Sequence, residues 1–412
     1  MRTKYLKALN DCRRIVIKVG TGLLADSTGF QSGMIKKLAR EIAYLKRNEK
    51  QVILVSSGAV GAGREALKSR PGYEPLAEPG LSRKQALAAI GQVHLISEYG
   101  RIFREHGIHT AQLLFSARDF RDRRAYLNIG HTLNELLSLD VVPIINENDT
   151  VSTEELKFGD NDMLSAACAG LFHADCLIIL TTVEGFLKDG SRVPFIPQVD
   201  FETISFAGGP TGPGSGGMRT KMEAARLGQK VGHFTAILPG QTESPIQSLM
   251  QGMDLGTLIP PMQTRWSNNP DRSDVPVSSA EEGAVASGSS ADRADPESGR
   301  PGRLDSEPRI AARKKWILYV PGEGNLYVDD GARKALLERG ASLLSAGIER
   351  MEGYFRQGDV VEVIDSANMV IARGLASLPS VELESVIGQG KSSVEAIHRD
   401  NMIVDLHPRL TG

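Results

Sequence analysis

The chain has 412 residues, more than one ordinary domain needs, so we expect two or three domains that each bury a core. Its formal net charge of −2 excludes a general electrostatic attraction to nucleic acid or to anionic membranes. Three cysteines without a CxxC pair, and no apolar run of the roughly 18 residues that span a bilayer, predict a cytoplasmic protein with free thiols.

Between residues 14 and 262, apolar runs rich in β-branched residues alternate with amphipathic helical stretches. This alternation predicts an α/β sandwich, in which helices cover a mostly parallel sheet. The expected strands are residues 14–20, 51–58, 141–148, 176–182 and 234–240. The expected helices include residues 34–48 and 82–106, and Ser82 and Gln85 have the spacing of a capping box at the start of the second.

The composition changes sharply after the last of these elements. Ser, Pro, Gly, Asp and Ala dominate residues 266–312, and burial cannot offset the ordering entropy of such a segment, which predicts a disordered linker. Residues 313–412 predict a small β-rich domain, a partly closed barrel. Its expected strands are residues 316–322, 324–330, 359–365 and 369–376. The expected domains are therefore residues 1–265 and 313–412, joined by the linker.

The first glycine-rich segment, KVGTG at residues 18–22, follows the first expected strand. In an α/β fold, ligands bind beyond the carboxyl ends of the strands, and glycine lets backbone N–H groups approach a phosphate. Lys18 would then supply positive charge to that phosphate. A solvated strand-end corner is the alternative, because the segment matches neither GxxxxGK[ST] nor GxGxxG.

Two further glycine-rich segments follow. VSSGAVGAG, residues 55–63, either presents backbone N–H groups to an anion or lets a helix pack closely on the sheet. The glycine run at residues 208–217 leads into Arg219, Thr220 and Lys221 at the head of an amphipathic helix, as in a phosphate-binding loop. A mobile loop is the alternative interpretation. In a phosphate-binding loop, Lys221 would be a second cation.

Two polar clusters, residues 146–150 and 159–162, lie close together in the sequence. The first follows a run that predicts a buried strand, and the second precedes small helix-forming residues. Asp149, Asn161 and Asp162 are candidate helix caps. Because capping uses one or two such groups rather than the whole set, the clusters also predict a site for a small polar ligand.

Taken together, these segments resemble the amino acid kinase family. The resemblance covers residues 14–262 and rests on KVGTGLL, VILVSSGAVGAGRE, SRKQALAAIGQ, VVPIINENDTV, KFGDNDMLSA and GSGGMRTKMEAA, in family order. Residues 313–412, with LLERGASLLSAGI, RQGDVVEVID and VIARGLA, are similar to a PUA domain. The resemblance implies an amino acid kinase-like three-layer sandwich with a mostly parallel central sheet, plus a small β-rich PUA-like barrel domain.

The resemblance also implies transfer of the γ-phosphoryl group of ATP, with Mg²⁺, to the 5-carboxylate of L-glutamate in the first step of proline biosynthesis. By the family motifs, Lys18 and Lys221 stabilise the transferring phosphoryl group, and Asp162 orients both lysines. The glutamate-binding positions match Ser57, Asp149 and Asn161. The nucleotide-binding positions match Lys18, Thr181, Thr182, Gly214, Ser215, Gly216, Gly217, Met218, Arg219 and Thr220. No metal ligand from the protein is implied.

Two positions depart from the family pattern. Thr182 stands where the family usually has aspartate, so a carboxylate that accepts hydrogen bonds from the nucleotide is lost. Arg219 stands where a small residue is usual, and it either adds a phosphate contact or points to solvent. Neither departure changes the two lysines.

Other functions and partners are weighed against this interpretation. Within the enzymes, a sibling kinase for aspartate, acetylglutamate, carbamate or a nucleotide is the alternative, and the two polar clusters with the PUA-like region argue against it. RNA is a candidate partner of the PUA-like domain, but balanced charge and the lack of an RRM or KH signature argue against RNA binding as the main function. We also expect feedback inhibition by proline, a homo-oligomer and no membrane association.

Overall fold

The computed structural model describes most of the chain. The described residues are 2–26, 29–74, 79–151, 161–208, 217–262, 312–320, 322–387 and 394–410. Residues 266–311 of the expected linker, and Gly214, Ser215 and Gly216 of the expected phosphate loop, lie outside them.

A seven-stranded sheet organises the first 262 residues, in the order β11-β10-β7-β1-β4-β6-β5. Its strands are β1 (Arg14–Val19), β4 (Gln51–Ser56), β5 (Thr110–Phe115), β6 (Val142–Glu147), β7 (Cys176–Thr181), β10 (Phe234–Pro239) and β11 (Thr257–Ile259). All neighbouring pairs are parallel except β10 and β11. The five expected strands are confirmed. Strands β5 and β11 were not predicted, because β5 is incompletely buried and β11 has only three residues.

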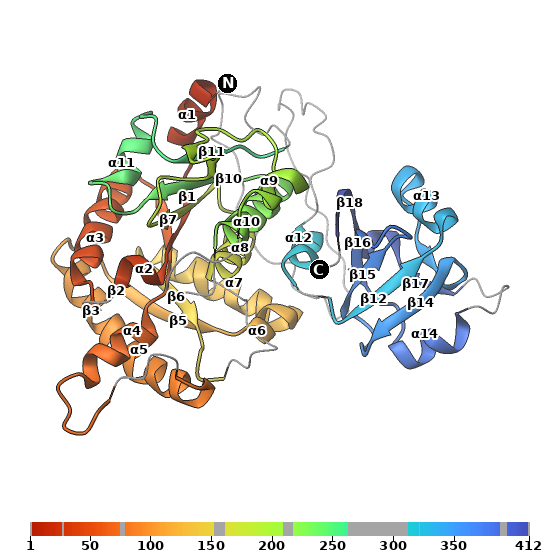
Figure 1. The fold of residues 1–412 in the computed structure, drawn as a ribbon, viewed down its shortest axis with the longest axis horizontal. Helices are drawn as coiled ribbons and strands as arrows, with labels where there is room; N and C mark the ends of the chain where they lie inside the picture. The colour runs from red at the N-terminus through yellow and green to blue at the C-terminus, as the bar shows by residue number, and fades with distance from the viewer. Residues whose placement is uncertain are drawn as a thin grey trace, which may run out of the picture.

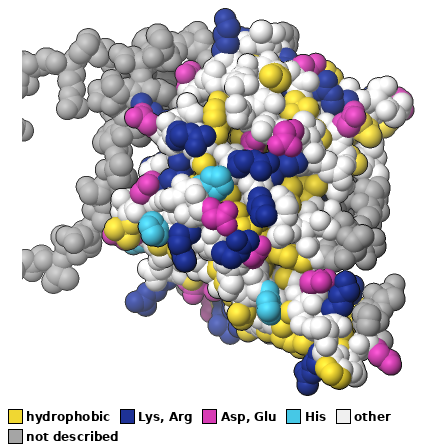
Figure 2. Space-filling view, turned by 90° about the vertical axis from the view of Figure 1, so that its left-hand side faces the viewer, with side chains coloured by type: hydrophobic (Ala, Val, Ile, Leu, Met, Phe, Trp, Pro, Cys, Tyr) yellow, Lys and Arg dark blue, Asp and Glu magenta, His cyan; other side chains and the backbone are white. Residues whose placement is uncertain are grey.

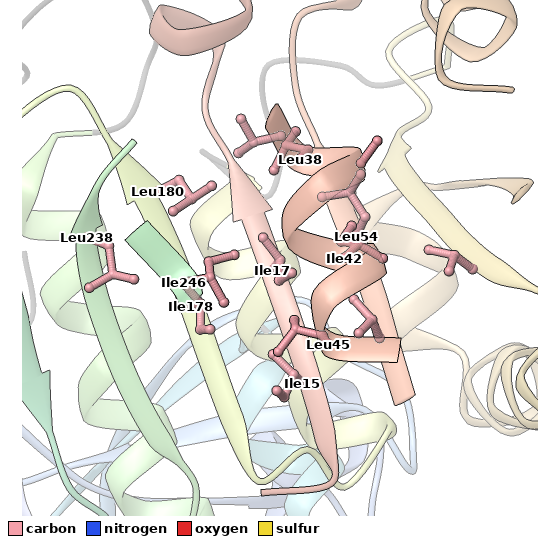
Figure 3. Close-up of a cluster of buried hydrophobic side chains, with 14 of the residues drawn as sticks. Ile15, Ile17, Leu38, Ile42, Leu45, Leu54, Ile178, Leu180, Leu238 and Ile246 are labelled. Carbon is pink, nitrogen blue, oxygen red and sulfur yellow. The ribbon is translucent and has the colours of Figure 1, made fainter. Parts of the chain in front are cut away.

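Helices cover both faces of this sheet, as expected for a three-layer sandwich (Figure 1). Side chains of α3 (Ser32–Arg47), α5 (Leu81–Arg104) and α11 (Pro245–Met250) pack on one face. Side chains of α7 (Arg123–Ser138), α8 (Asn161–Leu171) and α10 (Met218–Val231) pack on the other. Figure 3 shows part of the first layer, in which Ile15 and Ile17 of β1 lie among side chains of α3.

Alternation along β1 separates the two layers. Ile15, Ile17 and Val19 join the cluster on the α3 and α5 face, whereas Val16 joins the cluster on the α8 face.

The start of α5 corrects one expectation. Gly80 is its N-cap and the helix begins at Leu81, so the predicted capping box at Ser82 is wrong.

Several short elements connect the main ones. They are α1 (Arg2–Asn10), α2 (Thr21–Leu24), β2 (Ala25–Asp26), β3 (Gly29–Phe30), α4 (Ala59–Leu67), α6 (Ala117–Arg121), β8 (Leu187–Lys188), β9 (Ser191–Arg192) and α9 (Phe201–Ser205). The helix α4 begins after the turn of Ser57 and Gly58 that follows β4, and it packs closely on α5. A Cβ added to Gly63 would lie 1.9 Å from the carbonyl oxygen of Leu87, so this contact requires glycine.

The C-terminal region forms a second core around a five-stranded sheet in the order β14-β12-β15-β16-β18. Its elements are β12 (Gly324–Val328), α13 (Asp330–Arg339), β13 (Leu343–Leu344), β14 (Ile348–Gly353), β15 (Val360–Ile364), β16 (Met369–Leu375), α14 (Ser380–Val386), β17 (Glu395–Ile397) and β18 (Met402–Leu410). Strands β13 and β17 form a separate two-stranded sheet. The strands expected at residues 324–330, 359–365 and 369–376 are confirmed, and this part of the chain is β-rich.

The segment expected as a strand at residues 316–322 is instead the helix α12 (Ala312–Tyr319). Its residues Trp316 to Tyr319, and Val320 after it, are buried in the same cluster as residues of α7 and α8. Trp316 donates its indole N–H to the carbonyl oxygen of Phe120. A short apolar run fits a buried helix as well as a strand, so periodicity could not separate the two.

The PUA-like sheet holds the other end of α12. The guanidinium of Arg373 on β16 donates to the carbonyl oxygens of Leu318 and Val320, each at 3.2 Å, and it pairs with Glu362 of β15. In Figure 1, α12 lies between the seven-stranded sheet domain and the C-terminal sheet. The helix therefore contacts both parts of the chain.

One face of the molecule carries interspersed charges of both signs. Figure 2 shows Lys and Arg side chains next to Asp and Glu on the face that includes α3 and α5. Arg101 of α5 pairs with Glu98 and Glu105, and Arg40 of α3 pairs with Glu243. In the described part of this face, charges of both signs are therefore mixed. Within the described ranges, no helix is long and apolar enough to cross a membrane.

Candidate active site

The candidate site lies at the carboxyl ends of the parallel strands, where ligands bind in open α/β sheets. Lys18 is the fifth residue of β1, and Ser57 directly follows β4. Thr181 is the last residue of β7. Because these strands are neighbours and run in the same direction, their ends meet at one edge of the sheet.

Asp162 holds two lysines at this edge. Its Oδ1 atom lies 2.6 Å from Lys18 Nζ, and its Oδ2 atom lies 2.9 Å from Lys221 Nζ. Thr220 also donates its hydroxyl to Oδ2, at 2.9 Å. Lys18 shares the β1 face of Val16, toward α8, whose first turn carries Asp162.

All three charged side chains are withdrawn from water. The exposed fractions are 2% for Lys18, 7% for Lys221 and 0% for Asp162. Two ammonium groups around one carboxylate leave a net charge of +1 in a buried setting, where Coulomb interactions are stronger than in water. The arrangement can therefore attract and stabilise an anionic group.

Asn161, the residue before Asp162, joins the ends of two strands, β4 and β6, through its side-chain amide. Its Nδ2 atom donates to Ser57 Oγ at 2.7 Å, to the Ser56 carbonyl oxygen at 3.0 Å and to Asn146 Oδ1 at 3.1 Å. The first turn of α8 thus places Asn161 and Asp162 side by side. Asn161 binds the residues at the strand ends, and Asp162 binds the two lysines.

The turn after β4 is tied to β1. The backbone N–H of Ser57 donates to the Val19 carbonyl oxygen at 3.1 Å. Gly58 follows with φ of 96°, in the left-handed region, and begins α4 as its N-cap. A Cβ added there would lie 3.1 Å from the Leu24 Cβ atom. Both interpretations of this glycine-rich segment therefore fit its geometry, because it packs closely and also borders the lysine cluster.

The other expected residues surround this centre at different depths. Asp149 is half-buried, two residues beyond β6. Thr182 is exposed, and a Cβ added to Gly22 would lie 3.4 Å from its Cγ2 atom, so Thr182 lies beside the turn after β1. Gly217 is buried as the N-cap of α10, and Met218 is partly exposed. Arg219 is exposed and pairs with Glu223 on its own helix at 3.1 Å, so it points to solvent.

The comparisons with known proteins agree with this geometry. The sequence profile of the amino acid kinase family matches residues 13–233, and that of the PUA domain matches residues 324–399. The chain belongs to the amino acid kinase family.

Three relatives of this amino acid kinase are each named glutamate 5-kinase. The protein from Caldanaerobacter subterraneus subsp. tengcongensis is 38% identical over 95% of this chain and 97% of its own length. The protein from Pelobacter propionicus is 36% identical, with the same coverage of both chains. The protein from Moorella thermoacetica is also 36% identical, over 96% of this chain and 97% of its own. The similarity therefore spans both domains.

One side chain of the site, that of Asn146, was not predicted individually from the sequence. Asn146, the fifth residue of β6, accepts hydrogen bonds from Asn161 and from the Glu147 backbone N–H through Oδ1. Its Nδ2 atom is buried without a hydrogen-bond partner among the described residues. The only sequence signal was its membership of the cluster at residues 146–150, which does not separate Asn146 from its neighbours.

Proposed function

We propose that this amino acid kinase transfers the γ-phosphoryl group of ATP to the 5-carboxylate of L-glutamate, giving L-glutamyl 5-phosphate in the first step of proline biosynthesis. The observation that carries the proposal is the adjacency of two sites on α8. Asp162 holds Lys18 and Lys221, and its neighbour Asn161 binds the turn that contains Ser57. The names and full-length similarity of the relatives support the same reaction.

Charge stabilisation is the main chemical task of the protein. Phosphoryl transfer through a loose transition state asks for alignment and for cations beside the transferring group. Lys18 and Lys221 supply two such cations, and Asp162 fixes both ammonium groups in place before the substrates arrive. The acceptor needs no general base, because a carboxylate is already ionised at neutral pH.

Glutamate occupies the other half of the proposed site. Ser57 and Asn161 offer hydrogen bonds beside the lysine cluster, and the carboxylate of Asp149 pairs with the substrate ammonium group. These contacts orient the amino acid so that its 5-carboxylate faces the lysines. Asp149 would thereby select an amino acid over a substrate without an ammonium group.

ATP enters from the side of β7 and α10. In the proposal, Thr181 and Thr182 lie near the nucleotide, and residues 214–220 bind its phosphates at the start of α10, where a helix N-terminus favours anions. Mg²⁺ arrives on those phosphates, since this ion usually binds substrate phosphates and keeps several waters. In the described part of the chain, no group of three His, Cys, Asp or Glu side chains could hold a metal ion.

We also propose a domain organisation and a set of partners for this kinase. Residues 1–265 form the kinase domain, residues 266–312 the linker and residues 313–412 the PUA-like domain, with α12 completing the kinase core. We propose a homo-oligomer that proline inhibits, and RNA as a secondary partner of the PUA-like domain. Three buried thiols support a cytoplasmic location.

A substrate panel tests the reaction. The purified chain is incubated with ATP, Mg²⁺ and one acceptor from glutamate, aspartate, acetylglutamate and carbamate, and hydroxylamine traps any acyl phosphate as a hydroxamate. We expect hydroxamate with glutamate, at a rate at least tenfold above that of the other acceptors. Preference for another acceptor would replace the proposed substrate, and no acyl phosphate at all would contradict the reaction class.

A further inference from the structure

A buried tyrosine of α5 reaches the glutamate half of the site from the opposite face of the sheet. Tyr99 has no exposed surface, and its ring packs edge-on against Phe103 with 5.6 Å between ring centroids. Its hydroxyl oxygen lies 2.9 Å from Ser56 Oγ. The aromatic ring is thus a core residue, but the hydroxyl belongs to a hydrogen-bonded chain.

The donor in the hydrogen bond between Tyr99 and Ser56 follows from the single hydrogen of the serine hydroxyl. Ser56 donates its hydroxyl to the carbonyl oxygen of Ser57 at 3.0 Å, and a serine hydroxyl has one hydrogen. Tyr99 is therefore the donor to Ser56. Burial raises the pKa of the Tyr99 hydroxyl, so it keeps the proton that it donates.

Side chains from both faces of the sheet contact the Ser56–Ser57 turn. Alternation along β4 directs Val55 toward α8 and Ser56 toward α5, where Tyr99 lies. From the other side, Asn161 of α8 donates to the Ser56 carbonyl oxygen and to Ser57 Oγ. The turn is therefore held from both faces, by Asn161 on one and by Tyr99 through Ser56 on the other.

We propose that Tyr99 is a positioning residue for the amino acid substrate, acting through Ser56 on the turn that presents Ser57. This inference rests on the proposed binding of glutamate by Ser57 and Asn161. The nucleotide half of the site lies at β7 and α10, which Tyr99 does not hold. Loss of its hydroxyl should therefore weaken the use of glutamate and leave the use of ATP unchanged.

The test is the Tyr99→Phe variant of the full chain, which keeps the ring and removes the donor. A single hydrogen bond corresponds to about a three- to tenfold change in binding. We expect KM for glutamate to rise by about that factor, while KM for ATP stays within about twofold. In thermal unfolding, the rise in Tm that glutamate produces should shrink, and the rise that ADP produces should persist.

Tyr319→Phe is the matched control. Tyr319 is another buried tyrosine, and its hydroxyl has no hydrogen-bond partner within the described residues. The Tyr319→Phe variant should have the same KM for glutamate and the same KM for ATP as the wild type. The double variant Tyr99→Phe with Ser56→Ala should raise KM for glutamate no more than the larger single effect, because both changes interrupt one chain.

Three outcomes would overturn the inference. They are an unchanged KM for glutamate in Tyr99→Phe, equal rises in both KM values, and additive effects of Tyr99→Phe and Ser56→Ala. A purely structural role would lower the active fraction, and hence the apparent kcat, without separating the two KM values. Failure of the wild-type chain to use glutamate contradicts the proposed function itself, whereas an active wild type with an unaffected Tyr99→Phe variant contradicts this inference alone.

Discussion

Lys221 and Lys18 share one carboxylate, so each lysine depends on Asp162 for its position. Replacing Lys221 with methionine keeps an unbranched side chain of nearly the same length but removes a cation from the proposed phosphoryl site. We expect kcat to fall by on the order of 10²-fold or more, as when a focused electrostatic contact is lost. Lys18→Met should behave in the same way. Steady-state kinetics and circular dichroism on both variants measure the effect and check folding.

The exposed Lys84 of α5 provides the control, because Lys84→Met removes a solvent-exposed lysine charge rather than a buried one that Asp162 holds. Its kcat should equal that of the wild type. A folded Lys221→Met enzyme with near-normal kcat would remove Lys221 from the proposed chemistry.

Asp149 is proposed to pair with the ammonium group of glutamate, remote from the reacting carboxylate. Asp149→Asn is nearly isosteric and deletes the charge, so glutamate binding should weaken by roughly 1.5 to 3 kcal/mol, the range for a charged hydrogen bond. At about 1.4 kcal/mol per tenfold change, KM for glutamate should rise at least tenfold, while KM for ATP moves little. Proline inhibition should weaken in the same variant. If KM for ATP rose instead, Asp149 would belong to the nucleotide half.

The helix α3 holds the start of α11 through a buried carboxylate. Glu41 is 3% exposed and accepts the backbone N–H of Gln247 at 2.9 Å. Burial raises the pKa of Glu41 above its ordinary value of 4.5, so its contribution to stability is present below that value and is lost as pH rises through the folded pKa.

Glu41→Gln removes this titration and keeps an acceptor oxygen. The free energy of unfolding of the variant, relative to that of the wild type, should therefore increase as pH rises from about 4.5 to 7.5. Urea unfolding at several pH values measures the difference. Glu243→Gln, which makes the same substitution at an exposed carboxylate, is the control for the chemical change itself. A difference for Glu41→Gln that is constant across this range would contradict the prediction.

The predictability of the elements depended on how each one is buried. Five strands of the kinase sheet were predicted because continuous β-branched runs indicate strands covered on both faces. The edge strand β5 was missed because Gln112 and other partly exposed positions interrupt its apolar pattern. The helix α12 was predicted as a strand, because a five-residue apolar run that is buried all round carries no period.

The site was predictable by residue type but not by contact. Glycine-rich and polar clusters pointed to Lys18, Asp162 and Lys221, which the structure brings together. The three acceptors of Asn161 depend on the alignment of β4 and β6, which no local pattern specifies. Tyr99 gave no signal, because its partner lies 43 residues away on the sheet.

The helix α12 joins the two domains through buried contacts rather than through the chain alone. We expect proteases to cut within residues 266–311, where the composition predicts a linker. The two fragments should nevertheless stay together on size-exclusion chromatography, because Trp316 is buried against Tyr126 and bonded to Phe120.

Trp316→Ala should release the fragments, since loss of a buried tryptophan side chain costs about 3–5 kcal/mol. Tyr354→Ala, at a tyrosine that is 71% exposed, is the control and should leave them associated. Separation of the wild-type fragments after cleavage would show that α12 does not hold the domains together.

The contact between α8 and α12 limits which residues related proteins can carry at position 170. A Cβ added to Gly170 would lie 2.1 Å from the Cε2 atom of Tyr319, so a larger residue there would require the Tyr319 ring of α12 to move. A relative that ends after the kinase sheet has no such ring to accommodate, and alanine or a larger residue is then compatible with that position. We expect natural sequences that have a Trp-x-x-Tyr helix after the kinase part to have glycine at this position. Fusion to a PUA domain would then constrain a single residue of the kinase part.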